Sequence, residues 1–298
     1  MYSIRVSVLM SIAAIGLMAA GCGIGVSGPP SGQEMPDGID PWNPSTERTT
    51  SSIDFTGVKT IRVELPTGSV SVSQSNESGQ ASLKVTEVIL AKGLSNEALA
   101  DKLNGSAVSA SRSFVDNTRL DIKATIAAGL ADADITFDVR LVVPSGANIE
   151  ILLANGPVQV TNLSGNVEIH TANGAVTVTG LAGNLVAQTT LQPIDVSDIV
   201  GNVQVETSAA DVGLRLTPPS AGVVSAKTSE ATIHMTIAQA TAASLSLTAS
   251  EGKIITDLSG FSISNLATGD GFLTGILNGG GGQIEAVSPK GQIEFVGM

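Results

Sequence analysis

A repeat of eighteen residues constrains the fold of this chain more than any other feature. From Asn155 onward, apolar residues recur at that spacing in aligned columns, and the first column holds Val158, Val176, Ile194 and Val212. The other columns are Val160, Val178, Val196 and Leu214; Leu163, Leu181 and Ile199; Val167, Leu185 and Val203; Ile169, Ala187 and Val205; Gly165, Gly183 and Gly201; Asn166, Asn184 and Asn202; and Thr171, Thr189 and Thr207. Eight columns that maintain the eighteen-residue spacing without a gap indicate stacked structural repeats.

Apolar and polar residues alternate within each repeat, as in Val158-Gln159-Val160. Such alternation is typical of strands with one buried face. Glycines nine residues apart, at 156, 165, 174 and 183, divide each repeat into two strands. We therefore predict an all-β fold: a single-chain parallel β-solenoid with coils of about 18 residues, whose neighbouring coils hydrogen-bond at a spacing of about 4.8 Å.

The corners of the coils are predicted from the Gly-Asn pairs. Glycine permits a backbone with positive φ, so we expect that conformation at each corner. The asparagine that follows each glycine is expected to stack on the amide of the next coil, as in an asparagine ladder.

After Leu214 the period lengthens. Pro218-Pro219 marks an insertion in a corner loop, and the pattern resumes at Ile233 and Met235, then at Ile254. Near the end, Gly-Gln-Ile-Glu occurs at 282–285 and again at 291–294. The stretch from Asn155 to Met298 has room for about eight coils and a rod of roughly 35–40 Å.

Residues 53–150 carry the strand signal without the repeat, as in Ile61-Arg-Val-Glu-Leu65 and Ile135-Thr-Phe-Asp-Val139. One stretch, Ser95 to Leu103, is typical of a short helix with a serine N-cap. Solenoid ends need atypical caps to cover their strand edges. We therefore predict a β-rich N-terminal cap with one short helix over 53–150 and the solenoid repeats over 151–298, with 53–298 forming one folded unit.

The first 52 residues predict export. Arg5 precedes an apolar stretch that is too short to span a bilayer and that ends in small residues, as secretory signals do. The quartet Ala19-Ala20-Gly21-Cys22 resembles the lipobox of bacterial lipoproteins, and Cys22 is the only cysteine. We expect a signal peptide over 1–21, a lipid on Cys22, and a flexible tether over 22–52 that is rich in Pro, Gly, Ser and Thr. Trp42 lies in this tether, where packing against the domain is the favoured interpretation over a docking anchor.

The motifs as a set resemble those of the bacterial putative-adhesin β-solenoid lipoproteins, which are similar to auto-transporter adhesin head domains. They are Leu65-Pro-Thr-Gly-Ser-Val-Ser-Val72, Val142-Val-Pro-Ser-Gly-Ala-Asn-Ile149, Ala154-Asn-Gly-Pro-Val-Gln-Val160 and Ala172-Asn-Gly-Ala-Val-Thr-Val178. The resemblance covers about 53–298, and it implies a location in the cell envelope and an adhesin-like role. The chain departs from the pattern at Leu191-Gln192, where the Asn-Gly pair is missing, and at Pro218-Pro219. The family supplies no catalytic residues to carry over.

Catalytic chemistry finds little support in the sequence. Enzymes built on β-helices need paired carboxylates on an outward face. None of the outward columns of the repeat contains two acidic residues. These columns are Gln159, Thr177 and Asp195; Thr161, Thr179 and Ser197; Glu168, Val186 and Gln204; and His170, Gln188 and Glu206. Asp195 and Asp198 fit a solvated corner better than a site. Asp132 and Asp134 share one strand face but have no third ligand in view.

Metal binding finds as little support. A calcium-binding roll needs aspartates in each corner, and Gln283-Ile284 follows Gly279 to Gly282 instead. The two histidines, His170 and His234, stand far apart, which argues against zinc. We predict no enzyme activity, no metal and no cofactor.

The formal net charge is −12, which argues against nucleic acid and against electrostatic attraction to anionic lipid. Three functions stay open: an envelope-anchored adhesin-like interaction module, which we favour; a structural solenoid that self-assembles end to end; and a polysaccharide-active enzyme. The expected partners are the membrane, through the lipid on Cys22, and an envelope glycan or a surface protein. The expected place is outside the cytoplasm, on the outer membrane if the host has one.

Overall fold

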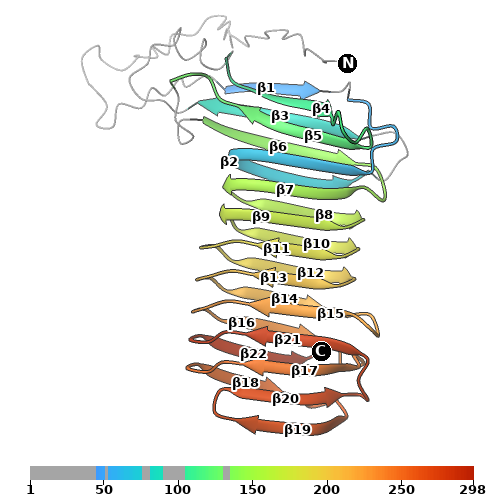
Figure 1. Cartoon of the computed structure of the whole chain (residues 1–298), viewed down its shortest axis with the longest axis vertical. Helices are drawn as coiled ribbons and strands as arrows, with labels where there is room; N and C mark the ends of the chain where they lie inside the picture. Colours follow the sequence, from blue (N-terminus) through green and yellow to red (C-terminus); the bar gives the residue numbers. More distant parts are fainter. Residues whose placement is uncertain (1–44, 51–52, 76–80, 90–104, 130–134) are drawn as a thin grey trace, which may run out of the picture.

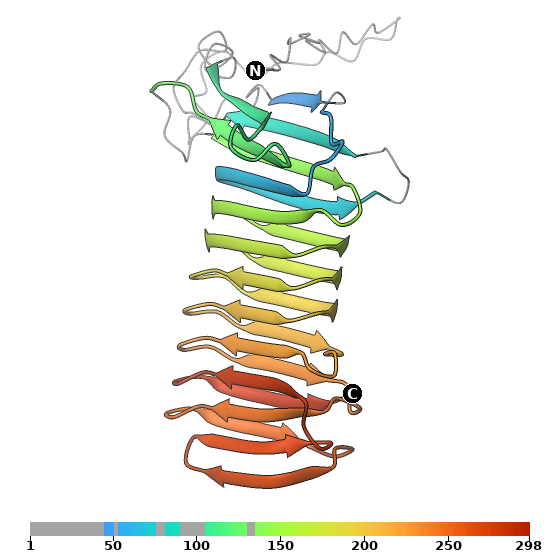
Figure 2. The same cartoon turned by 45° about the vertical axis from the view of Figure 1, so that its right-hand side comes forward.

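The computed structural model is a long rod built from stacked strands (Figures 1 and 2). It describes residues 45–50, 53–75, 81–89, 105–129 and 135–298. The predicted signal peptide, Cys22, Trp42, the predicted helix over 95–103, and the pair Asp132 and Asp134 lie outside these residues. Within the described ranges, no helix has the length and hydropathy to cross a membrane.

Every element with defined bounds is a strand, so the all-β prediction is confirmed. The strands of the N-terminal third are β1 (Ser45–Thr50), β2 (Thr60–Gln74), β3 (Ser82–Ile89), β4 (Ala107–Arg112), β5 (Arg119–Thr125), β6 (Ile135–Val143) and β7 (Asn148–Asn155). The strands of the middle are β8 (Val158–Ser164), β9 (Val167–Asn173), β10 (Val176–Ala182), β11 (Leu185–Gln188), β12 (Ile194–Val200), β13 (Val203–Glu206), β14 (Val212–Leu216), β15 (Val223–Lys227) and β16 (Ile233–Ile237). The strands of the C-terminal end are β17 (Ala243–Thr248), β18 (Lys253–Asp257), β19 (Ile263–Gly269), β20 (Phe272–Leu277), β21 (Gly282–Val287) and β22 (Gln292–Gly297).

The rod has two long faces. Face A runs β1-β3-β6-β2-β8-β10-β12-β14-β16-β22-β18, and face B runs β4-β5-β2-β7-β9-β11-β13-β15-β21-β17-β20-β19. The long strand β2 belongs to both faces, which makes them one continuous sheet of 22 strands. The pairings are parallel through the middle and turn antiparallel only at the two ends, where β1, β3 and β4 lie at one end and β19 and β20 at the other.

The register of the middle strands follows the repeat. Val176 pairs with Val158 on one side and with Ile194 on the other, and Ile194 pairs with Val212. The second strand of each repeat behaves in the same way, since Leu185 pairs with Val167 and with Val203. The apolar columns predicted from the sequence are therefore neighbours across successive coils.

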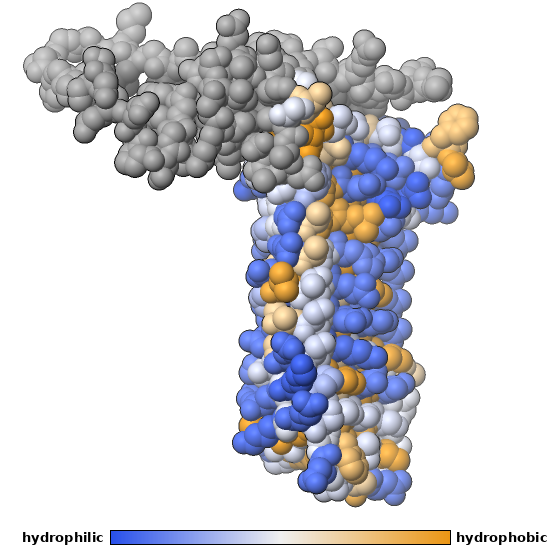
Figure 3. Space-filling view, turned by 60° about the vertical axis from the view of Figure 1, so that its left-hand side comes forward, coloured by the Kyte–Doolittle hydropathy of each residue, from blue (hydrophilic) through white to orange (hydrophobic). Residues whose placement is uncertain are grey.

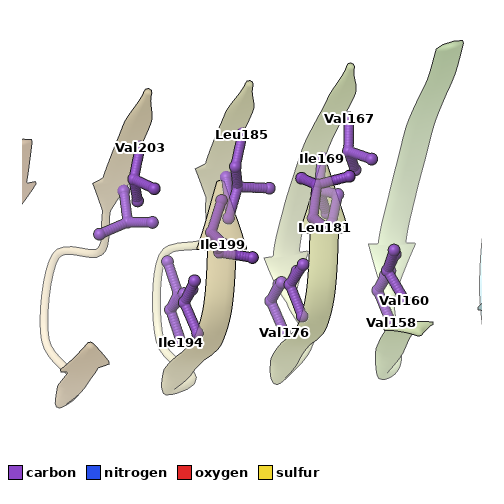
Figure 4. Packing of buried hydrophobic residues seen from close by; sticks show 14 of the residues in the cluster. Val158, Val160, Val167, Ile169, Val176, Leu181, Leu185, Ile194, Ile199 and Val203 are labelled. Carbon is purple, nitrogen blue, oxygen red and sulfur yellow. The ribbon is translucent and has the colours of Figure 1, made fainter. Parts of the chain in front are cut away.

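These columns form the core of the rod. Val158, Val176, Ile194 and Val212 are all buried, and so are the columns of the opposite face. Figure 4 shows the side chains of both faces pointing into the space between the two strands of a coil. Each coil stacks aliphatic side chains of similar size on those of the next coil, which removes apolar surface from water along the whole rod.

The asparagine ladder is present at the corner before face B. Oδ1 of Asn166 accepts from the backbone N–H of Asn184 at 3.0 Å, and Oδ1 of Asn184 accepts from the N–H of Asn202 at 3.0 Å. The ladder extends past the predicted column at both ends, to Asn148 and to the N–H of Val223. Each step satisfies a backbone donor at a corner where the sheet pairing is interrupted.

The glycines of these corners have a different role from the predicted one. Gly156 and Gly165 do have positive φ, but Gly183 is not among the residues with that conformation. A Cβ on Gly183 would stand 2.0 Å from the carbonyl oxygen of Gly165. The prediction of positive φ at every corner is therefore wrong, because most of these glycines are required by the close approach of the coil before them.

The threonine column turns inward and fixes the turns that follow the strands of face B. Thr189, Thr207 and Thr228 are buried. Oγ1 of Thr189 donates to the carbonyl of Gly174 at 3.1 Å, and Oγ1 of Thr228 donates to the carbonyl of Ala210 at 3.2 Å. Buried hydroxyls are usually hydrogen-bonded, and at these two threonines the acceptor is the irregular backbone between two strands, whereas the buried Oγ1 of Thr171 has no hydrogen-bond partner among the described residues.

At the N-terminal end, the order of the coils in space differs from their order in the sequence. The first part of β2 lies between β5 and β7, and its second part lies between β6 and β8. An early segment of the chain therefore forms a complete coil between two later ones (Figure 1). The sequence-predicted boundary at 150/151 falls within β7, and β1 falls within the stretch 22–52 that the sequence predicts as a tether.

The same exchange occurs at the C-terminal end. β21 lies between β15 and β17, and β22 lies between β16 and β18. Ile254 therefore pairs with Ile293 and not with the coil of Ile233. After β16 the chain thus continues one coil further along the rod, forms the β19–β20 hairpin, and returns to fill the intervening coil with β21 and β22.

Candidate functional site

Face B carries a shallow groove that runs along the rod. Its volume is about 550 Å³. It crosses the carboxyl ends of β7, β9, β11 and β13 and the middle of β2, and its lining includes Glu64, Leu65, Leu152, Leu153, His170, Gln188, Glu206 and the turn residues Thr190 and Ser208. The groove therefore runs across five coils and not into the core.

One outward column forms the length of this groove. Glu64 pairs with Leu152, Leu152 with His170, His170 with Gln188, and Gln188 with Glu206. Because the strands are parallel and in register, these side chains stand about 4.8 Å apart along the rod. The column thus presents hydrogen-bonding groups at a regular spacing, interrupted by one apolar side chain.

His170 lies at the centre of the column, and both of its ring nitrogens have side-chain partners. Nδ1 is 3.0 Å from Oε1 of Gln188, and Nε2 is 2.7 Å from Oε1 of Glu168. The ring is therefore fixed by groups on both sides. Both ring nitrogens are thus within hydrogen-bond distance of a neighbouring side chain.

The acidic residues beside the groove are arranged differently from the prediction. Glu150 pairs directly with Glu168 across β7 and β9, so the inference that no outward column gathers two acids is wrong. Arg62 lies on the other side of Glu150, with Nη1 3.3 Å from its carboxylate. Each of the two carboxylates thus has its own partner, Arg62 for Glu150 and His170 for Glu168, and they do not form a free pair.

Glu64 closes the groove at its N-terminal end. Its carboxylate lies 3.0 Å from Nζ of Lys123 and 3.9 Å from Nε of Arg62. The hydrogen bond from Lys123 holds the pKa of Glu64 below its ordinary value, and the positive charges of Lys123 and Arg62 act in the same direction, against a smaller effect of burial. Glu64 is therefore an ionised acceptor at neutral pH.

The other residues weighed from the sequence lie on face A. His234 points outward there, with Nδ1 2.8 Å from Oε2 of Glu294. Asp195 is exposed on the same face, and Asp198 is an exposed residue within β12 that has a positive φ of 56°. His170 and His234 lie on different faces, and the part of the chain that the structure describes holds no group of three metal-ligating side chains.

Sequence reasoning found three of the groove residues, His170, Gln188 and Glu206, and missed Glu64 and Leu152, as well as Glu150 beside the groove. The missed residues come from β2 and β7, which precede the point at which the eighteen-residue repeat becomes regular. A partial signal was present, because Ile61-Arg-Val-Glu-Leu65 alternates strictly and Ile149-Glu-Ile alternates before the apolar pair Leu152-Leu153. Nothing in the sequence, however, places β2 directly before β7.

Comparison with known proteins gives structural neighbours only. No protein-family model and no curated protein matches the chain. A putative cell adhesion protein from Clostridium sporogenes is similar at 8% identity and a TM-score of 0.35, over 86% of this chain and 100% of that one. A putative adhesin from Bacteroides fragilis has 11% identity and a TM-score of 0.34, over 86% and 97% of the two chains. A putative adhesin from Parabacteroides distasonis has 12% identity and a TM-score of 0.35, over 85% and 97%.

Proposed function

We propose that this chain is an envelope-anchored, non-catalytic binding module with an adhesin-like role, and that the groove on face B is its contact surface. The observation that carries the proposal is the column Glu64, Leu152, His170, Gln188 and Glu206, which lies along one groove across five coils. Glu64, His170 and Gln188 are held by neighbouring side chains, and the whole column is spaced by the coil repeat, as a surface for an extended partner requires.

The chemistry of the column favours a partner rich in hydroxyl or amide groups, such as an envelope glycan or an extended segment of a surface protein. Carboxylates and an amide accept or donate several hydrogen bonds each, and Leu152 offers a small apolar contact. Large ligand pockets for small molecules are enclosed and mainly apolar, whereas this groove is open and its lining is about equally polar and apolar. The space-filling view shows a long side of the rod that is mostly hydrophilic, with separate hydrophobic residues on it (Figure 3).

Affinity at a single groove is expected to be low. The side chains that usually dominate binding energy are Trp, Tyr and Arg, and the groove lining contains none of them. Useful binding then depends on many copies held on one surface, where each additional contact is made at a high effective concentration.

The anchor is the second part of the proposal. Lipid on Cys22 holds the rod on a membrane, because two or three acyl chains retain a protein on a bilayer far longer than one. The rod then lies outside the cytoplasm, on the outer membrane if the host has one. Cys22→Ala should move the protein from the membrane to the soluble fraction, or leave the signal uncleaved. A Cys22→Ala protein with unchanged mass and membrane retention would show that the anchor lies elsewhere.

The binding experiment compares the mature Cys22→Ala chain in solution with the same chain displayed densely on beads, using envelope glycans and whole cells. Binding should be strong only in the dense format, and Gln188→Ala with Glu206→Ala should abolish it. The matched control is Gln159→Ala with Thr177→Ala, which changes exposed residues on face A. Equal binding in both formats, or equal loss with both pairs of variants, would contradict the proposal, and turnover of a glycan would assign an enzyme instead.

A further inference from the structure

The turn between β4 and β5 exposes two apolar side chains at the N-terminal end of the rod. Phe114 is 97% exposed and Val115 is 95% exposed, the highest values among the large hydrophobic residues described. Figure 3 shows apolar atoms projecting from the side of the rod at the end that carries β1 to β6. We refer to residues 113–118 as the apolar turn.

The apolar turn is held in one conformation by its own hydrogen bonds. The N–H of Ser113 donates to the carbonyl of Arg119 at 2.9 Å, and the N–H of Arg119 donates to the carbonyl of Asp116 at 2.9 Å. Oδ1 of Asp116 accepts from the N–H of Thr118 at 2.9 Å and from its hydroxyl at 2.7 Å. The exposure of Phe114 and Val115 is therefore a feature of an ordered turn.

Arg112 ties the apolar turn to the segment that leads out of the tether. Nη1 of Arg112 donates to the carbonyl of Asn117 at 2.8 Å, and Nη2 donates to the carbonyls of Asp54 and Thr56 at 3.0 and 2.6 Å. Residues 54–56 follow β1 and precede the first coil. Phe114 and Val115 thus lie at the end of the rod from which the chain runs back toward Cys22.

The charge around the apolar turn differs from that of the rest of the rod. Across 53–64 and 105–125, basic residues outnumber acidic ones by five to four. Across 151–298 there are eleven acidic residues and four basic ones. An anionic bilayer repels the body of the rod and does not repel this end.

We propose that Phe114 and Val115 insert into the bilayer to which the chain is anchored, and that this second contact sets the orientation of the rod on the membrane. The proposal rests on the lipid anchor at Cys22. A convex turn with two apolar residues cannot bury the roughly 800 Å² per partner that a stable protein interface needs, whereas a bilayer accepts a convex apolar tip. Two side chains bind a bilayer weakly by themselves, and the tether supplies the effective concentration that makes the contact persist.

The test places a fluorescent reporter at the proposed contact. In a Trp42→Phe background, Phe114→Trp is compared with Leu266→Trp, a position on β19 that is 53% exposed at the opposite end of the rod. Both lipidated proteins are reconstituted in vesicles of phosphatidylethanolamine and phosphatidylglycerol, with and without brominated acyl chains. The emission of the Phe114→Trp protein should shift to shorter wavelength and lose at least half its intensity to the brominated lipid, and the emission of the Leu266→Trp protein should do neither.

A second arm separates the apolar turn from the anchor. The Cys22→Ala form of each reporter variant is titrated with the same vesicles at high lipid concentration. Only the Phe114→Trp protein should show the emission shift to shorter wavelength. An added Val115→Ser substitution should weaken that response severalfold. Lipidated Phe114→Trp protein that sediments with vesicles while its indole stays unquenched would overturn the insertion and leave the anchor standing. A shift produced by envelope proteins and not by vesicles would overturn it in favour of a protein partner.

Discussion

Nδ1 of His234 lies 2.8 Å from Oε2 of Glu294, although sixty residues of chain separate them. The contact exists because β22 occupies the position next to β16 that the following coil would fill in a simple solenoid. The strands β17 to β20 lie beyond it and are connected to the rest of the rod through β21 and β22. The last residues of the chain are thus an internal part of the stack.

Removal of residues 282–298 should therefore unfold the distal end and spare the middle. β21 and β22 supply the pairings that join β15 and β16 to β17 and β18. In a solenoid each coil depends mainly on its neighbours, so amide hydrogen exchange should become fast across 243–277 and stay slow across 158–206. Glu294→Gln is the control, because it keeps the strand and alters only the contact with His234. Persistent protection of 243–277 in the truncated chain would contradict the observed pairing.

The core of the coils should not accept a charge. Val176 is 0% exposed and stands between Val158 and Ile194. Val176→Asp buries a carboxylate without a partner, which costs several kcal/mol, about 3 or more. Gln159→Asp, at an exposed position whose register neighbours Ser71 and Thr177 are uncharged, should change the free energy of unfolding by less than about 0.5 kcal/mol. Denaturant unfolding of both variants checks this, and similar midpoints would mean that the register is wrong.

The asparagine ladder should contribute to stability through its side-chain oxygens. Asn184→Ala removes the acceptor for the N–H of Asn202 and the donor to Oδ1 of Asn166. The expected loss is about 1 kcal/mol, because the corner is partly open to water. Thr177→Ala, on an exposed face, serves as the comparison and should be nearly neutral in denaturant unfolding. Equal stability of the Asn184→Ala and Thr177→Ala proteins would mean that the ladder contributes nothing.

The ion pair at the N-terminal end of the groove should make a small, pH-dependent contribution. Lys123 holds the pKa of Glu64 below its ordinary value, so the pair stabilises the folded state above the unfolded pKa of about 4.3. That stability is lost as the pH falls through the lower, folded pKa. The side chains are 46% and 53% exposed, and exposed pairs of this kind contribute about 0–1 kcal/mol.

Unfolding in urea at pH 7 and at pH 3 tests this contribution. Glu64→Gln should be less stable than the parent at pH 7, and the difference should shrink at pH 3. Lys123→Met should remove the same increment, so that the double variant is no worse than either single one. A difference that grows in acid would show that Glu64 has an elevated pKa.

The fold of the middle of the rod could be predicted well, because the sequence signals that determine it come from residues close together in the chain. Coils of equal length place Val158, Val176, Ile194 and Val212 in line, and the alternation on either side of each residue decides which side chains face inward. Both signals lie within one or two repeats, and the structure contains them as expected. The corner glycines were located correctly for the same reason. The prediction was wrong about why glycine is needed there, since close approach of the preceding coil and not a positive φ requires most of them.

The order of the strands at the two ends could not be predicted. The strands that pair there are far apart in the sequence, and several strands with the same apolar pattern could occupy each position. Ile233, Ile254 and Ile293 all stand in strands of the same type, so the pattern does not say which two are adjacent. The groove residues could be predicted only in part for a similar reason. His170, Gln188 and Glu206 belong to the regular repeat, whereas Glu64 reaches the groove only because β2 is inserted between β5 and β7. Phe114 and Val115 carry no periodic signal at all.

The position of β2 has a mechanical consequence. A pull on the N-terminal end of the chain reaches β1 at the edge of the sheet and then β2, which has parallel neighbours on both sides over both halves of its length. Release of β2 must break its hydrogen bonds to β5 and β7 along its first half and to β6 and β8 along its second. A pull on the N-terminal end therefore frees β1, which is paired on one side only, before it can draw β2 out of the stack.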